Sequence, residues 1–425
     1  MPIAVFSSAA FILLAISAPI FIAILVPTFI SFELFGPPIP STVLVQKMMQ
    51  GINKFSLLAI PLFIFSADII ARGQIGQRLL KLVESLIGHI TGGLAITTAI
   101  ACALFGAISG VGAAAVISIG PIVYPALLRQ GYSRGFAVGL ILTASTLAML
   151  IPPGVAMILY SLQTMSSVSS VFLAGLSAGV IFTALLAIYS YVYARVLNIG
   201  RQGKASWNER LTSLREAGWA IGLPAIIFGG IYSGTFTPTE AAAGACVYAM
   251  FVETVVYRQL KFRELFKVST ASAMVIAMLL ILIAAGSAMT YFLTVMNVSD
   301  AISGMLDGNS AVTVLMLINV LFLMAGMIID PNSAIIVLTP LIYPVATALG
   351  IDPIHLGAVI VLNVALGMIS PPFGLNIFVG ITTFNVPYWE VVKAVLPFIL
   401  VSLVALAIVT YIPELILWLP NLVRG

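Results

Sequence analysis

Charged residues are scarce in this chain. Asp, Glu, Lys and Arg make up 8% of the 425 residues, whereas hydrophobic residues make up 61%. A soluble domain has roughly a quarter of its residues charged. The composition therefore excludes a soluble globular protein and predicts a polytopic membrane protein, since many segments reach the ~20 apolar residues that a span needs. These segments alternate too little to be β-barrel strands, so the predicted fold is all-α.

Several functional signatures are missing as well. The sequence has no Gly-x-x-x-x-Gly-Lys-Ser/Thr loop, so nothing indicates ATP hydrolysis by this chain. It has no His/Cys cluster, which argues against a transition-metal site. Cys102 and Cys246 stand alone in apolar segments and are predicted to be small core residues. The first 30 residues lack a basic start, so they are predicted to form a first helix rather than a removed signal peptide.

What the sequence does contain is a pattern of helix breakers that occurs twice. The second copy follows the first at a constant spacing, because 340 − 121 and 371 − 152 both equal 219. Matched interruptions inside two apolar halves are the best sequence pointer to the binding site of a transporter. The matched positions are Pro121, Tyr124, Pro125, Gly131, Pro152 and Pro153 in the first copy, and Pro340, Tyr343, Pro344, Gly350, Pro371 and Pro372 in the second.

The distribution of Lys and Arg predicts the topology. Basic loops mark the cytoplasmic side, and residues 94–128 have basic segments on both flanks. This stretch is therefore predicted to be a re-entrant hairpin with its tip near Ser109-Gly110. An odd number of predicted crossings separates it from the apolar stretch 311–346, so that second hairpin enters from the opposite face. The N-terminus is predicted to be cytoplasmic and the C-terminus periplasmic.

The predicted domain organisation follows from these segments. Residues 1–215 form the first repeat, and residues 216–425 form an extra crossing followed by the inverted second repeat. Residues 72–92 have apolar side chains every three or four positions, which predicts an amphipathic helical arm at the membrane interface. The remaining predicted elements are single helices at 3–33 and at 42–71 (kinked near Pro61), a broken helix at 136–162, crossings at 171–194, 217–234 (the extra crossing), 237–257 and 268–294, a second arm at 298–308, a broken helix at 356–383 and a last crossing at 394–419.

Breaks within the membrane expose backbone groups that can bind ions. The unpaired carbonyls at the end of one half-helix, with nearby side-chain oxygens, suit a hard cation such as Na⁺. The unpaired N–H groups at the start of the other attract anions. The candidate Na⁺ ligands are Gly106, Ser109, Ala148, Ile151 and Pro153 at the first site, and Gly326, Asp330, Gly367, Ser370 and Phe373 at the second. The candidate substrate contacts are Gly110, Gly154, Asn332 and Asn376.

Some polar residues leave alternatives open. An ionisable group at membrane depth is a functional hypothesis by default, and Asp330 is predicted either to bind a cation or to cap the half-helix that begins near Pro331. Asp68 is interpreted as an interfacial anchor or cap, with a proton carrier as the alternative. Asn332, Asn363 and Asn376 either donate to a substrate or satisfy the hairpin backbone. No Arg lies near either tip to grip a carboxylate.

Motifs along nearly the whole chain resemble the large membrane subunit (M) of tripartite ATP-independent periplasmic (TRAP) transporters. The resemblance implies a Na⁺-coupled elevator transporter of the ion-transporter superfamily, with Na⁺ at the hairpin tips and broken helices. It also implies two partners, a small four-helix membrane subunit (Q) and a periplasmic substrate-binding protein (P). The stretches that carry it are 59–63, 105–110, 150–153, 233–242, 350–355, 368–372 and 412–420.

The family's usual substrates are organic acids: C4-dicarboxylates, sialic acid, other sugar acids and ectoine-type solutes. The expected function is thus secondary active import of a small organic acid, coupled to two or more Na⁺, across the bacterial inner membrane, with no enzymatic activity and no cofactor. The first tip departs from the family, which commonly has Ser where Val111 and Gly154 stand here. Both changes remove hydroxyls, so the first site is expected to rely on backbone carbonyls.

The sequence leaves three alternatives open. A stand-alone dicarboxylate/Na⁺ symporter of the same superfamily would need no binding protein. An intramembrane hydrolase would use Ser109, or Asp68 with Asp330, but no His or Lys is placed to activate the serine. A non-transporting scaffold would not need two inverted, broken motifs.

Overall fold

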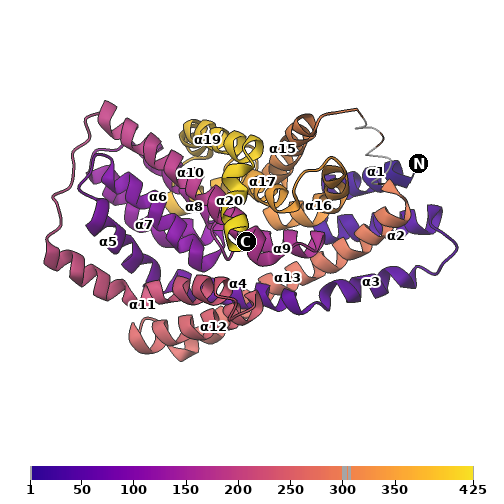
Figure 1. Ribbon diagram of the computed structural model, residues 1–425, viewed down its shortest axis with the longest axis horizontal. Helices are drawn as coiled ribbons and strands as arrows, with labels where there is room; N and C mark the ends of the chain where they lie inside the picture. The colour runs from indigo at the N-terminus through magenta and orange to yellow at the C-terminus, as the bar shows by residue number, and fades with distance from the viewer. Residues whose placement is uncertain (1, 299–303, 305–307, 425) are drawn as a thin grey trace.

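The fold was examined in a computed structural model that describes residues 2–298, 304 and 308–424. These residues form helices joined by short turns, without any β-strand (Figure 1). Ten of the helices in this described part are long and apolar enough to cross a membrane. The chain is thus an all-α multi-pass membrane protein, as its composition predicts.

The helices of the first half are α1 (Pro2–Ala15), α2 (Ile20–Phe35), α3 (Thr42–Ile52), the 3₁₀ turn η1 (Phe55–Leu58), α4 (Ala59–Arg72), α5 (Ile75–Ile87), α6 (Gly93–Ser109), α7 (Gly112–Arg129), α8 (Arg134–Leu150), α9 (Val155–Thr164) and α10 (Val168–Val196). Those of the second half are α11 (Trp207–Tyr232), α12 (Pro238–Phe251), the π-helical turn η2 (Val252–Val256), α13 (Phe262–Val295), α15 (Ala311–Ile328), α16 (Pro331–Ala348), α17 (Pro353–Gly367), α18 (Leu375–Phe384), α19 (Tyr388–Tyr411) and α20 (Glu414–Arg424).

The helix boundaries repeat with the spacing of the sequence motifs. Helix α7 begins at Gly112 and α16 at Pro331, and 331 − 112 again equals 219. The pairs α6 and α15, α8 and α17, and α9 and α18 obey the same shift to within two residues at each end. Five candidate spans, from α8–α9 to α13, lie between the two hairpins. Because five is odd, the second hairpin enters from the face opposite to the first.

The two broken helices form the centre of the molecule. Every residue of α8 from Phe136 to Leu150 is buried, and so is every residue of α17 from Ile354 to Gly367. The two helices pack against each other, with α6 against α8 and α15 against α17 (Figure 1). A helix that is apolar on all sides is typical of a protein core or a membrane span. Helices α8 and α17 are therefore the most deeply buried elements of the two repeats, and the hairpins pack around them.

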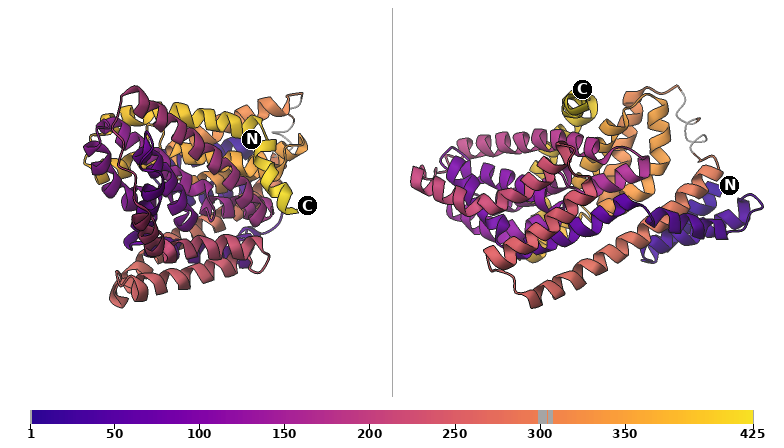
Figure 2. Two further views of the ribbon diagram at one scale, coloured as in Figure 1. Left: turned by 60° about the vertical axis from the view of Figure 1, so that its left-hand side comes forward. Right: turned by 60° about the horizontal axis from the view of Figure 1, so that its bottom comes forward.

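Helices α2 to α5 and α11 to α13 lie along the other side of this centre. Figure 1 shows α13 as a long helix beside α3, and both views of Figure 2 show it extending along one side of the molecule. The predicted amphipathic arm is α5, whose apolar residues Leu79 and Val83 are buried while Arg78 and Lys81 are not. The carboxylate of Glu253, from η2, accepts the backbone N–H groups of Gln74 and Ile75 and so caps α5.

Two predictions for the N-terminal region were wrong in detail. Residues 3–33 form two helices, α1 and α2, which pack side by side and are separated by a turn at 16–19 where Ser17 has a φ of 61°. Helices α1 and α2 together return the chain to the side on which it starts. The structure therefore does not decide on which side of the membrane the N-terminus lies, and its cytoplasmic location stays a prediction. Residues 42–71 are interrupted at Asn53–Lys54, and Pro61 lies in the first turn of α4 rather than at a kink.

The C-terminal region also differs from the prediction. The crossing expected at 394–419 ends at Tyr411, and a separate helix, α20, follows. Pro413 explains the interruption, since it has no N–H to continue the helix. Helix α20 packs against α10 and α17 (Figure 1). The predicted second arm at 298–308 falls almost wholly outside the described residues.

Candidate functional site

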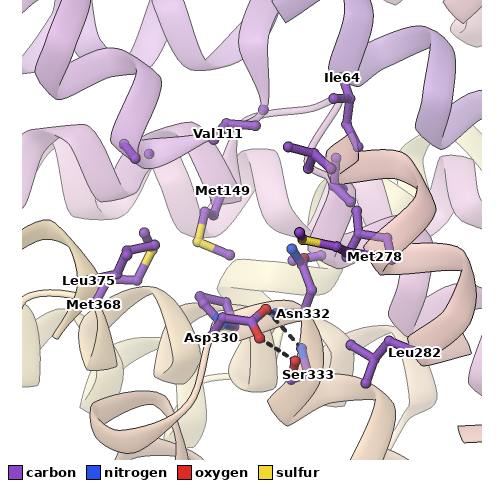
Figure 3. A pocket seen from close by; sticks show the side chains of 18 of the residues that line it. Ile64, Val111, Met149, Met278, Leu282, Asp330, Asn332, Ser333, Met368 and Leu375 are labelled. Carbon is purple, nitrogen blue, oxygen red and sulfur yellow. Dashed lines mark hydrogen bonds between the residues drawn. The ribbon is translucent and has the colours of Figure 1, made fainter. Parts of the chain in front are cut away.

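Both hairpin tips, and residues beside both helix breaks, line one cavity. Its volume is about 630 Å³. Figure 3 shows Val111 from the first tip and Asp330 from the second on its walls, with Met149 and Met368 from the ends of the broken helices. The opposite wall comes from α2, α4 and α13. Since the hairpins enter from opposite faces and meet here, each ends inside the membrane, as a re-entrant hairpin does.

The first tip is closed by a glycine that packs on the first break. Gly110 has a φ of 63°, in the left-handed region, and its N–H donates to the carbonyl of Gly106 at 2.9 Å. A Cβ on Gly110 would lie 2.3 Å from the carbonyl oxygen of Pro153. A Cβ on Gly106 would lie 2.5 Å from the Cα of Ala148. Only glycine fits at both positions, so backbone meets backbone throughout this contact.

The second tip is closed by a carboxylate. Asp330 is the N-cap of α16: its Oδ1 accepts the N–H groups of Asn332 and Ser333, each at 3.1 Å, and its Oδ2 accepts the hydroxyl of Ser333 (Figure 3). The capping alternative for Asp330 is therefore correct in this structure. Because Asp330 also lines the cavity, capping leaves its carboxylate positioned to meet a cation there. Behind the tip, Gly326 packs directly against Gly367.

The candidate Na⁺ ligands lie mostly behind the tips. Among them only Asp330 lines the cavity. The five residues of the first set gather where the first tip packs on the first break, and Ser109 there is fully buried. In the second set, the hydroxyl of Ser370 donates to the carbonyl of Leu366 at 2.9 Å, while Phe373 is 58% exposed. Their role in binding Na⁺ stays a prediction.

The candidate substrate contacts divide into two groups. Gly110 and Asn332 line the cavity, whereas Gly154 and Asn376 are not part of its wall. The amide of Asn376 donates to Ser145 Oγ at 2.9 Å and thereby ties α18 to α8. Asn363 is likewise turned to protein, since it donates to Asn319 Oδ1 at 2.7 Å. For these two asparagines the structural alternative describes the contacts that are present.

Sequence reasoning underestimated Asp68. It was interpreted as an interfacial anchor or cap, yet it lies on the cavity wall contributed by α4, and its Oδ2 accepts the hydroxyl of Ser272 on α13 at 2.5 Å. The available signal was an ionisable residue in the apolar run 59–71, but its nearness to Arg72 pointed to the interface instead. The structure thus brings two carboxylates, from opposite walls, into one cavity.

The electrostatic character of the cavity is mixed. The described residues that line it include Asp68 and Asp330 but no Lys, Arg or His. The first residues of α7, α9, α16 and α18 also belong to its rim or wall. Helix N-termini carry partial positive charge and bind anions. At α16 the N–H groups of Asn332 and Ser333 are already accepted by Asp330. The cavity therefore offers an anionic ligand the N-termini of α7 and α9, which have no side-chain cap, rather than basic side chains.

Two inverted hairpins and two interrupted helices that meet around a central cavity define the class of this protein, a secondary membrane transporter. The model of the tripartite ATP-independent periplasmic transporter, DctM component, matches residues 8–415. The chain therefore belongs to the family of TRAP transporter large permeases, and it is a transporter permease rather than an enzyme.

Individual relatives agree with this assignment. The chain is 40% identical over 413 residues to the ectoine TRAP transporter large permease protein TeaC of Halomonas elongata, covering 96% of this chain and 97% of that protein. It is 40% identical over 377 residues to the C4-dicarboxylate TRAP transporter large permease protein DctM of Pseudomonas aeruginosa, covering 88% of each. The crystal structure of the Alcanivorax borkumensis YdaH transporter shares the fold, with a TM-score of 0.66, 15% identity and coverage of 89% and 87%.

Proposed function

We propose that this chain is the large permease of a Na⁺-coupled importer of a small organic acid in the bacterial inner membrane. The observation that carries the proposal is the single cavity lined by both tips and by residues beside both breaks. A substrate carboxylate would face the helix N-termini there. The names of relatives support an organic acid: they include permeases for ectoine, C4-dicarboxylates and isethionate.

Na⁺ would bind behind the tips, where backbone is concentrated. At the first site the carbonyl of Pro153 points to Gly110, and Gly106 and Ala148 are in backbone contact. At the second, Gly326 and Gly367 are in contact and Asp330 is near. Carbonyl and carboxylate oxygens are the ligands that hard cations prefer. Bound Na⁺ would also hold each tip on its break, which links ion binding to the shape of the cavity.

The transport step would be an elevator movement. The hairpins and broken helices, built around α8 and α17, would move together against the wall formed by α2, α4 and α13. The arm α5 would stay with that wall, since Glu253 binds the N-terminus of α5 to the turn that follows α12. As family members do, the chain would work with a small membrane subunit and a periplasmic binding protein.

The test is reconstitution of all three components in proteoliposomes. We expect uptake that depends on an inward Na⁺ gradient and on the binding protein. Uptake that is unchanged when choline replaces Na⁺ would refute the Na⁺ coupling. Uptake without the binding protein would instead favour a stand-alone symporter.

A further inference from the structure

The charge of the cavity has a consequence for the substrate. The wall formed by α4 and α13 carries Asp68, and the described lining residues hold no basic side chain. Only one protein contact is present at this carboxylate in the described residues, the Ser272 hydroxyl on Oδ2. Its Oδ1 has no protein partner among them and is not enclosed by protein. A solute that displaces water from this oxygen leaves the carboxylate uncompensated unless the solute itself brings a positive group.

Asp330 does not create the same demand. Its two oxygens accept two backbone N–H groups and one hydroxyl at the start of α16, where the helix dipole also favours a negative charge. The second tip therefore compensates its own carboxylate. The opposite wall does not compensate the carboxylate of Asp68 in this way, because Asp68 is the tenth residue of α4 and does not lie at the N-terminus of that helix.

The other lining residues suit a bulky cation with a spread charge. On the same two helices the wall includes Ile64, one turn before Asp68, and Val275 and Met278, which follow Ser272 on α13. Phe21 of α2 also borders the cavity. An aromatic face and thioether sulfur are soft, polarisable neighbours that attract a weakly hydrated cation. A small, strongly hydrated ammonium would lose its water there with few donors or acceptors in return.

We propose that Asp68 is a specificity-determining residue and that the transported solute is a net-neutral zwitterion. Its carboxylate faces the uncapped N-terminus of α7 at the first tip, and its positive, charge-delocalised group faces Asp68. This proposal rests on the proposed transport function and adds the charge type of the substrate. With a dianion, the second carboxylate would face Asp68 across an apolar cavity without a compensating cation, and like charges in such a setting repel strongly.

The first experiment measures substrate charge and needs no permease variant. Thermal unfolding of the partner binding protein is followed with ectoine and glycine betaine as zwitterions and with succinate as a dianion. We expect a zwitterion to raise its Tm and to be taken up by the reconstituted three-component system. Stabilisation and Na⁺-dependent uptake of succinate alone would overturn the zwitterion proposal but leave the proposed function standing. Uptake of the stabilising solute that is unchanged when choline replaces Na⁺ would overturn the proposed function itself.

The second experiment assigns the effect to Asp68. For zwitterion uptake, Asp68→Asn is expected to lower kcat/KM by about tenfold or more, because it removes the partner of a desolvated charge. Asp68→Glu retains the charge and is expected to retain most of the activity. Ser272→Ala is the matched control: it removes the hydrogen bond to Asp68 but not the charge, and should stay near wild type. The Na⁺ concentration for half-maximal uptake should not change in any of the three. Wild-type kcat/KM in Asp68→Asn, or an equal loss in Ser272→Ala, would overturn the assignment.

Discussion

The two hairpin tips have the same backbone plan but are closed by different means. At the first, a left-handed Gly110 packs against the carbonyl of Pro153, and the next helix begins at Gly112, after Val111, without a side-chain cap. At the second, the chain turns through extended residues and Asp330 caps the next helix. The repeat thus duplicates where helices break, while side chains decide how each break is stabilised. The first tip should be sensitive to added volume and the second to lost charge.

The largest effect is expected for Gly110→Ala. Left-handed backbone costs a non-glycine residue about 1–2 kcal/mol, and the new Cβ would overlap the oxygen of Pro153 at 2.3 Å. The free energy of unfolding should fall by at least about 1–2 kcal/mol, and uptake should fall because the first tip would be displaced from the first break. The Tm of the purified complex should fall as well.

Gly131→Ala is the matched control for Gly110→Ala. Gly131 has a φ of 95°, yet its Cβ would meet no atom within 4 Å. It therefore has the backbone penalty without the collision. Similar losses in the two variants would show that backbone conformation, and not the contact with the first break, makes Gly110 necessary.

The next largest effect tests the packing behind the second tip. A Cβ on Gly367 would lie 2.4 Å from the carbonyl carbon of Gly326, whereas a Cβ on Gly326 would have its nearest neighbours at 3.1–3.2 Å. Overpacking typically costs about 1–3 kcal/mol. We expect Gly367→Ala at the upper end and Gly326→Ala at the lower end, read from thermal unfolding of the purified complex. The opposite order would mean that α15 adapts more easily than α17 and would contradict the geometry.

Asp330 allows charge and capping to be separated. Asp330→Ala removes both and should cost about 0.5–2 kcal/mol of stability, the usual value of an N-cap. Asp330→Asn keeps a good capping residue without the charge, so stability should change little. If Asp330 also meets Na⁺, both variants should raise the Na⁺ concentration for half-maximal uptake. An unchanged Na⁺ dependence of uptake in Asp330→Asn would show that Asp330 caps α16 and does not bind Na⁺.

Much of this architecture could be predicted from the sequence. The pairs Pro152-Pro153 and Pro371-Pro372 interrupt the helices in which they lie, because proline lacks an N–H and restricts the residue before it. Their constant spacing therefore located both broken helices before any coordinates were known.

The site could be predicted only in part, because it depends on packing between distant segments. Local sequence shows that Asp68 is ionisable, but only the contact of α4 with α13 turns it to the cavity. Asn376 looked like a substrate donor, whereas Ser145, 231 positions earlier in the chain, accepts its hydrogen bond. The turn at Ile16–Pro19 was missed because an apolar run of sufficient length reads as one helix when a short turn has no charged residue.

The smallest effect concerns the hydroxyl that the first tip lacks. Val111 precedes α7 with a φ of −128° and cannot cap it, whereas serine at that position would offer an acceptor to the first free N–H groups. Val111→Ser should therefore raise the Tm slightly, by a fraction of the ~1 kcal/mol that a cap is worth. It should leave the Na⁺ dependence of uptake unchanged, because the first site is expected to use carbonyls. Val111→Ala, which removes the methyl groups without adding oxygen, is the control for lost packing. A marked gain in Na⁺ affinity for serine but not alanine would show that a side-chain ligand can act at the first tip, and the proposed contrast between the two sites would be lost.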